Sequence, residues 1–385
     1  MTGKPLHLSA RAAVEEQNAL SAARERVNAH GVVVTDLTDS NPTRHGLTDP
    51  AIMSVLASHL TQALRYAPDP KGWLPAREAL AARFGGSPDE YWLTASTSEA
   101  YSWLMTAVGD PGDAAATPTP GYPLIEPLAK LAAMTPVPYM AYYVHPSGWE
   151  LDLDSVATAV ANPAVRALVA VSPNNPTGAY VHPDEAVAIG AMCTKAGLPI
   201  IADEVFRPYH LEAQPAAPLA QAAGDEAVVV TFDGLSKLLA APQLKLGWLR
   251  LTGPSSLTAP LAARLDSIAD AYLSVNSPVA CALPDLLGLA DSTITRVSQR
   301  CQENMAKLLT LGGGYRVRRA EGGWVALVDM PPLCDDDELG INLLGRGLAA
   351  HPGWFYDIAD THVLAISLLP KPEAFADALA RLPLD

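Results

Sequence analysis

The sequence has few cysteines and no long uninterrupted apolar run. Its four cysteines, Cys193, Cys281, Cys301 and Cys334, are scattered, and no C-x-x-C pair occurs. The pattern therefore indicates neither a zinc site nor a disulfide framework, and it fits a reducing compartment. Residues 1–10 lack the apolar core of a signal peptide, and no apolar stretch approaches a membrane span. We expect a soluble cytoplasmic protein with no membrane partner and no bound metal.

Positive charge is also scarce. The chain has 26 Lys and Arg against 41 Asp and Glu, which gives a net charge of −15. Such a surface repels a nucleic-acid backbone, so we expect no nucleic-acid partner. What remains is an ordinary globular composition, with 49% apolar and 17% charged residues. A length of 385 residues suits a large domain plus a smaller one.

Short apolar runs alternate with helical stretches through most of the chain. Residues 10–30 predict one helix that ends at Gly31, and residues 32–38 predict a short strand. Further runs lie at 165–171, 198–202 and 227–232, and further helices at 98–108, 183–196 and much of 267–311. Strands that alternate with helices predict a mostly parallel sheet covered on both faces. Ligands of such sheets bind at the carboxyl ends of the strands.

Four motifs follow one another in the loops that come after these runs. They are Thr119-Pro120-Gly121-Tyr122-Pro123, Ser172-Pro173-Asn174-Asn175-Pro176-Thr177-Gly178, Asp203-Glu204-Val205-Phe206 and Gly234-Leu235-Ser236-Lys237, with Lys245-Leu246-Gly247-Trp248 shortly after. Taken singly, each is common: N-P-T-G is a good turn in any loop, and an Asp-Glu pair often caps a helix. Their order, spacing and position after strands are what make them specific.

This set resembles the class I/II aminotransferases, which are fold-type I enzymes dependent on pyridoxal 5′-phosphate (PLP), over residues 36–369. Residues 40–44, 242–248 and 351–355 resemble a bacterial subgroup of that family. The resemblance implies an α/β fold whose large domain has a mixed, mostly parallel, seven-stranded sheet between helices. A smaller α+β domain completes it. We expect the large PLP-binding domain at 45–270 and the small domain at 1–44 and 271–385.

The resemblance also assigns roles around the cofactor ring. Lys237 matches the lysine that forms an imine with the PLP aldehyde, and the freed amine then serves as the base that moves the α-proton. Asp203 matches the carboxylate that keeps the ring nitrogen protonated, so that the ring withdraws electrons. Asn175 matches the partner of the ring hydroxyl oxygen, and Tyr122 matches the aromatic side chain that stacks on the ring.

The cofactor phosphate is a dianion and needs donors. The segment from Ala95 to Ala100 lies where a strand gives way to a helix, whose free N–H groups and dipole attract anions. The resemblance implies that the phosphate is bound by Ser96, Thr97, Ser98, Ser236, Lys245 and Tyr66. In the family the last of these reaches across from the neighbouring subunit, which implies a homodimer with shared active sites.

The sequence departs from the family at three positions, where the family usually has an arginine, a tyrosine and a second arginine. Lys245 stands where an arginine usually binds the phosphate, which keeps the charge but loses the two-pronged geometry. Phe206 stands where a tyrosine would donate to the ring oxygen. Ala365 stands where an arginine grips the substrate carboxylate. The loop with Asn41 and Arg44 is our candidate replacement at the substrate entrance.

A second candidate cation for the substrate carboxylate is Arg207, which follows Phe206. The leading function is transamination from a small-molecule amino acid to a 2-oxo acid. The altered substrate end keeps an alternative open, namely β- or γ-elimination, replacement or C–C bond formation on an activated amino acid such as S-adenosylmethionine. A third interpretation is a ligand-binding module of the same fold without catalysis.

Overall fold

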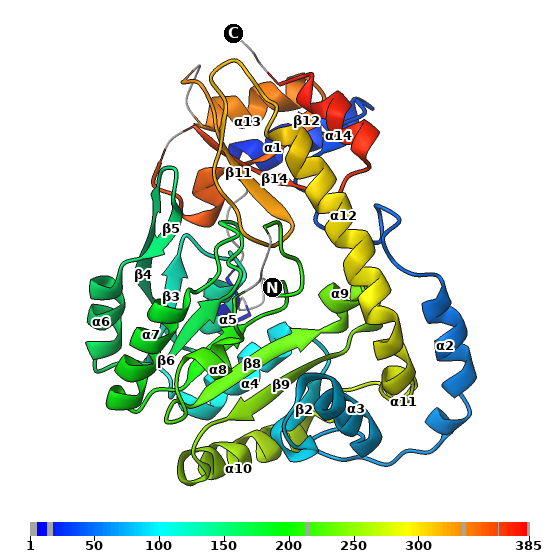
Figure 1. Ribbon diagram of the computed structural model, residues 1–385, viewed down its shortest axis with the longest axis vertical. Coiled ribbons are helices and arrows are strands. Elements are labelled where there is room, and N and C mark those ends of the chain that lie inside the picture. Colours follow the sequence, from blue (N-terminus) through cyan, green and yellow to red (C-terminus); the bar gives the residue numbers. More distant parts are fainter. Residues whose placement is uncertain (1–5, 14–17, 213–215, 333–335, 361, 383–385) are drawn as a thin grey trace, which may run out of the picture.

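The computed structural model describes residues 6–13, 18–212, 216–332, 336–360 and 362–382. It is built on an eight-stranded sheet with the order β2-β9-β8-β7-β6-β3-β4-β5 (Figure 1). The strands are β2 (Tyr91–Thr94), β3 (Ala114–Thr119), β4 (Thr135–Val144), β5 (Gly148–Leu151), β6 (Val165–Val171), β7 (Ile200–Asp203), β8 (Val229–Gly234) and β9 (Gly247–Thr252).

The strands of this large sheet are mostly parallel, as predicted. Only the pairs β2–β9, β8–β9 and β4–β5 are antiparallel. The sheet has eight strands where seven were expected. The difference arises because a turn at residues 145–147 folds β5 back on the outer edge of β4.

Helices cover both faces of the large sheet, because successive side chains of its buried strands point to opposite faces. On β6, Ala167 and Val169 pack with one set of helices, and Leu168 and Ala170 with the other. The first set is α4 (Thr97–Val108), α5 (Ile125–Leu131) and α10 (Ser255–Tyr272). The second set is α6 (Leu153–Ala161), α7 (Pro183–Ala196) and α8 (Leu219–Ala222). The predicted helix at 183–196 is confirmed residue for residue.

A smaller antiparallel sheet with the order β10-β11-β14-β13 lies above the large one in Figure 1. Its strands are β10 (Arg316–Val317), β11 (Val325–Asp329), β13 (His351–Pro352) and β14 (Val363–Ser367), and beside it β1 (Thr35–Asp36) pairs with β12 (Leu348–Ala349). The helices at this end are α1 (Ala19–Ala29), α13 (Asp336–Gly345) and α14 (Pro372–Leu379). The long helix α12 (Ala290–Leu308) runs from α11 up to this sheet (Figure 1).

At the β2 edge of the large sheet, α2 (Ala51–His59), α3 (Leu74–Phe84) and α11 (Ser277–Leu286) pack together. Short 3-10 helices join the longer elements: η1 (Ala10–Ala12), η2 (Gln62–Leu64), η3 (Pro88–Glu90), η4 (Pro242–Leu244), η5 (Leu287–Leu289) and η6 (Gly353–Tyr356). The domain boundaries at residues 45 and 271 stay a prediction.

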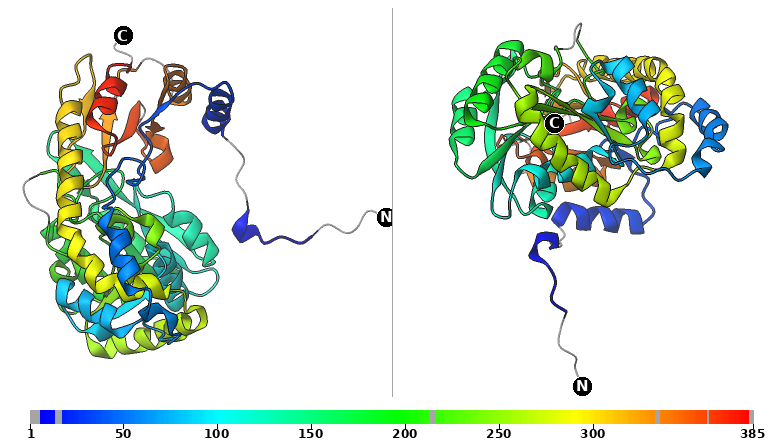
Figure 2. Two further views of the ribbon diagram at one scale, coloured as in Figure 1. Left: turned by 90° about the vertical axis from the view of Figure 1, so that its right-hand side faces the viewer. Right: turned by 90° about the horizontal axis from the view of Figure 1, so that it is seen from below.

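The single helix expected over residues 10–30 is wrong. The η1 turn stops before Ala13, whose backbone is extended, and α1 begins only at Ala19. Asn18 caps α1 through its side-chain oxygen, which accepts from the Ser21 N–H at 2.8 Å. Residues 14–17 lie outside the described part of the chain. Figure 2 shows the segment before them leading away from α1, and the Arg11 guanidinium donates to the Leu131 carbonyl at 3.4 Å.

The structure describes only part of the chain on which two expectations rest, those about disulfides and about membrane spans. Cys193, Cys281 and Cys301 are buried thiols outside any disulfide, and Cys334 lies outside the described residues. Among the helices that the structure describes, none combines the length and the apolar character that crossing a membrane would require.

Candidate active site

A cavity of about 440 Å³ lies at the carboxyl ends of β6, β7 and β8. Their last residues, Val171, Asp203 and Gly234, line its floor. Side chains from the smaller sheet and η6 form the opposite wall. A larger hollow of about 1040 Å³ lies at the amino ends of the same strands, near Val165 and Val228, and contains none of the predicted site residues. The floor is where a parallel sheet presents its ligand-binding loops.

Lys237 lies in the cavity on the short helix α9 (Leu235–Leu238), directly after β8. Its amine is 5.0 Å from the centre of the Phe206 ring and 4.8 Å from that of Trp324. Burial among these rings lowers the pKa of Lys237 to about 8, and the charge of Asp203 only partly opposes this effect. The amine therefore reaches its nucleophilic, uncharged form at a lower pH than an ordinary lysine does.

Asp203 ends β7 and is buried. One carboxylate oxygen accepts from the Tyr101 hydroxyl at 2.9 Å, and the other accepts from the Val205 N–H at 3.3 Å. Burial raises the pKa of Asp203, while these two hydrogen bonds and the charge of Lys237 lower it. A cationic group placed against this carboxylate would favour its ionised form.

Asn175 and Tyr122 come from two loops that the structure joins above the sheet. The neighbouring Asn174 amide donates to the Pro120 carbonyl at 3.3 Å, which ties the loops together. The Asn175 side-chain oxygen is buried and finds no hydrogen-bond partner among the described residues. A buried polar atom of this kind is costly unless a ligand satisfies it.

The first turn of α4 borders the same cavity with Ser96, Thr97 and Ser98, and Ser236 of α9 also lines it. The Ser96 hydroxyl accepts from the Glu99 N–H at 3.2 Å, so this residue is the helix N-cap. A β-carbon at residue 247 would lie 3.2 Å from the Thr97 backbone nitrogen, so only glycine fits without a shift. The glycine therefore lets β9 approach the free N–H groups of α4, where an anion would bind.

Four of the predicted site residues do not line this cavity. Lys245 is exposed, with a left-handed backbone (φ 51°) after η4. Tyr66 is 76% exposed and borders a separate hollow of about 220 Å³. Asn41 accepts from the Thr43 N–H at 3.1 Å within its own loop.

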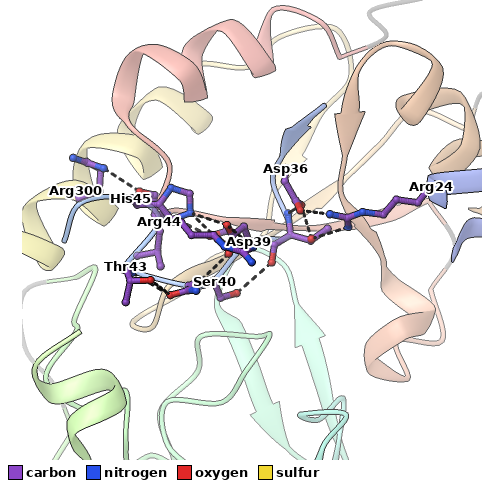
Figure 3. A network of polar contacts seen from close by, with 12 residues as sticks. Arg24, Asp36, Asp39, Ser40, Thr43, Arg44, His45 and Arg300 are labelled. Atoms are coloured by element: carbon purple, nitrogen blue, oxygen red, sulfur yellow. Dashed lines mark hydrogen bonds and ion pairs between the residues drawn. The ribbon is translucent and has the colours of Figure 1, made fainter. Parts of the chain in front are cut away.

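Arg44 lies beside Asp39 (Figure 3), with 3.4 Å between its guanidinium and the carboxylate. Its side chain is 69% exposed. Arg207 lies 3.8 Å from Glu204 and does not border the cavity either. Neither of the two candidate cations for a substrate carboxylate is thus brought to the cavity in this chain.

Sequence reasoning missed five residues of the site: Tyr101, Trp324, His351, Phe355 and Tyr356. Tyr101 lies one turn after the predicted phosphate-binding segment of α4, so helical periodicity provides a weak signal for it. The segment 351–355 had been noted as a subgroup motif, but nothing in the sequence places it over the cavity. Trp324 carries no local signal of this kind.

Comparisons with known proteins agree with this geometry. The family model described as aminotransferase class I and II matches residues 33–373. The chain belongs to this family. Its similarity to the alanine aminotransferase of Mycobacterium tuberculosis is 28% identity over 89% of this chain and 77% of that protein. Similarity to the glutamate-pyruvate aminotransferase AlaA of Escherichia coli is 26%, over 80% and 73% of the two chains.

A solved structure of alanine aminotransferase from Pyrococcus furiosus has the same fold, with a TM-score of 0.86 and 22% identity. It covers 97% of this chain and 98% of that one. The expected fold and family are thereby confirmed, and the chain is an enzyme of the aminotransferase kind. The alternative of elimination, replacement or C–C bond formation is not favoured, because these relatives are named aminotransferases.

The cofactor of class I/II aminotransferases is PLP, and the residues of the cavity fit it. The cavity offers a buried amine at Lys237, a buried carboxylate at Asp203 and an unsatisfied amide oxygen at Asn175. The open first turn of α4 offers N–H donors for a phosphate. Each chemical feature of PLP therefore has a group of matching chemistry in one enclosed space.

Proposed function

We propose that this enzyme binds PLP in the 440 Å³ cavity and transfers the amino group of a small amino acid, such as alanine, to a 2-oxo acid. The observation that carries the proposal is the meeting of a buried lysine amine and a buried carboxylate in one cavity with an unsatisfied amide oxygen. The names of the relatives support alanine as the donor and 2-oxoglutarate as an acceptor.

PLP, when bound, supplies an aldehyde that captures an amine and a ring that withdraws electrons from it. Lys237 would hold the aldehyde and then, once freed, take the proton from the α-carbon of the substrate. Asp203, oriented by the Tyr101 hydroxyl at 2.9 Å, would hold a proton on the ring nitrogen. The unsatisfied Asn175 side-chain oxygen would accept a hydrogen bond from the ring hydroxyl, and Tyr122 would stack on the ring.

The phosphate would be bound by the N–H groups and hydroxyls at the start of α4, together with Ser236. The position of these groups on a 12-residue helix supports this role, because the dipole of a helix favours an anion at its N-terminus. Lys245 would contribute charge from the exposed loop before β9 rather than a contact inside the cavity.

Incubation of the PLP-loaded enzyme with L-alanine and 2-oxoglutarate tests the reaction. We expect pyruvate and glutamate in equal amounts, and no product from Lys237→Ala. A reductant that traps the lysine–cofactor bond should mark Lys237 in peptide mass spectra. Absence of both pyruvate and glutamate, with PLP bound to Lys237, would refute transamination of alanine.

We further propose a cytoplasmic homodimer in which Tyr66 contributes to the partner's active site. The support is a set of exposed apolar side chains within residues 53–66, which include most of α2 and all of η2, namely Met53, Leu60, Leu64 and Tyr66. Light scattering should give twice the chain mass. Mixed subunits of Lys237→Ala and Tyr66→Ala should regain activity, because each hybrid dimer would contain one intact site. A mixture that stays inactive would contradict shared sites.

A further inference from the structure

The carboxylate of an amino-acid substrate needs a hydrogen-bonding partner once it leaves water for this cavity. This requirement rests on the function proposed above. Among the described residues that line the cavity, Lys237 and His351 are the two whose side chains can carry a positive charge. Lys237 is committed to the cofactor. His351 is therefore the remaining basic side chain for the substrate.

His351 opens strand β13 and stands directly opposite Ala365 of β14. Partners in antiparallel register share one face of the sheet, with their Cβ atoms about 5 Å apart. Ala365 is 2% exposed and carries only a methyl group. The face on which the family would carry an arginine thus bears an imidazole from the neighbouring strand, and that imidazole borders the cavity.

Two aromatic neighbours hold the imidazole in place. The ring stacks on Phe355 at 4.2 Å between centroids and 12° between planes. Its Nδ1 lies 3.3 Å from the Tyr356 hydroxyl. The Tyr356 carbonyl in turn accepts from the Gly121 N–H at 3.2 Å, next to Tyr122. The imidazole is therefore linked to the loop whose tyrosine is assigned to the cofactor ring.

The imidazole is uncharged near neutral pH in the absence of a ligand. Burial lowers the pKa of His351 to about 4, the charge of Arg24 lowers it further, and Asp36 opposes them. Arg24 and Asp36, whose charges act on the ring, form an ion pair with each other. Burial also raises the pKa of Tyr356, so its hydroxyl keeps the proton and can donate to Nδ1. The remaining nitrogen, Nε2, then carries the N–H group.

We propose that His351 is the specificity residue that binds the α-carboxylate of the substrate, with its Nε2–H as the donor, in place of the arginine absent at Ala365. Arg44 and Arg207 are less suited, because both lie outside the cavity and each faces an acidic side chain. The subsite therefore recognises a carboxylate by hydrogen bonding from an oriented neutral ring rather than by a two-pronged ion pair.

The test compares two amines that differ in the carboxylate alone. L-Alanine and isopropylamine, which has a methyl group in place of the carboxylate, are titrated into the PLP-loaded enzyme while its visible absorbance is recorded. His351→Phe keeps an aromatic ring against Phe355 and removes the N–H donor. We expect it to raise the dissociation constant of alanine about tenfold or more, and that of isopropylamine less than about twofold.

Two further variants make the result specific. His351→Gln restores a side-chain N–H and should recover part of the affinity for alanine. His145→Phe makes the same exchange in the exposed turn before β5 and should change neither constant. Equal losses for both amines in His351→Phe, or no loss for alanine, would overturn the proposal. A loss confined to alanine in Arg44→Ala, with none in His351→Phe, would assign the role to Arg44.

The outcomes also separate this inference from the function on which it rests. If wild-type enzyme binds PLP but responds to no amino acid, the proposed transamination fails, and the role of His351 fails with it. If wild-type enzyme converts alanine while His351→Phe binds it equally well, the reaction stands and the assignment of His351 alone is refuted.

Discussion

The floor and the wall of the active-site cavity are built from different kinds of residues. The floor carries charge and amide groups from the ends of three parallel strands, with Lys237, Asp203 and Asn175 as its main members. The wall is mostly aromatic and comes from the smaller sheet and η6, with Trp324, His351 and others. This division suggests that the floor performs the chemistry on any substrate, whereas the wall decides which substrate is accepted.

The largest expected effect tests the floor. Lys237→Ala should lower kcat about 10⁴-fold or more for every amino acid, because it removes both the amine that holds the cofactor and the base. PLP should still bind, through the start of α4, and equilibrium dialysis would measure it. If the variant kept wild-type turnover with one substrate and lost it with another, the floor would not act equally on all substrates.

Asp203→Asn should give the second-largest loss, about 10³-fold in kcat. The amide keeps the shape of the side chain but removes the negative charge that would hold a proton on the ring nitrogen. Steady-state kinetics with two unrelated amino acids would measure it. Since the floor serves all substrates, both should lose the same factor within about twofold. Unequal losses would indicate that Asp203 also helps to select the amino-acid substrate.

The floor could be predicted from the sequence to a large extent, and the wall could not. Lys237, Asp203 and Asn175 each follow a strand-like apolar run within a few residues, so local pattern and the rule for parallel sheets place them together. His351 reaches the cavity through its antiparallel register with Ala365, which is a long-range pairing of β13 and β14. The hydrophobic pattern of residues 345–370 does not predict that His351 pairs with Ala365.

Similar reasons explain the errors in the fold. The strand β5 was missed because it is four residues long and follows a turn after β4. The helix expected from residue 10 failed because a run of Ala and Glu favours a helix without fixing its start, which Asn18 sets here through its side chain. Helix α7 was predicted in full because Pro183 begins it and Gly197 ends it.

The pH dependence of cofactor uptake sharpens the description of the floor. Because burial lowers the pKa of Lys237 to about 8, its amine loses the proton as the pH rises through that value. The rate at which cofactor-free protein captures PLP should rise about 30-fold between pH 6.5 and 9.5 and then level off. Stopped-flow absorbance would record it. Free Nα-acetyllysine, whose side-chain amine keeps an ordinary pKa, serves as the control. Its rate of PLP capture should continue to rise above pH 9.5.

The smallest expected effect concerns Tyr101, which touches the floor from helix α4. Tyr101→Phe removes the 2.9 Å hydrogen bond to Asp203 and keeps the edge-to-face contact with Phe232 at 4.8 Å. A hydrogen bond to a carboxylate that keeps its other partner is worth about 1 kcal/mol, so kcat should fall roughly threefold to tenfold. The KM for alanine should stay constant, because Tyr101 orients a floor residue and does not reach the substrate side. A change confined to KM would show that Tyr101 acts in substrate binding, like the residues of the wall, and not through Asp203.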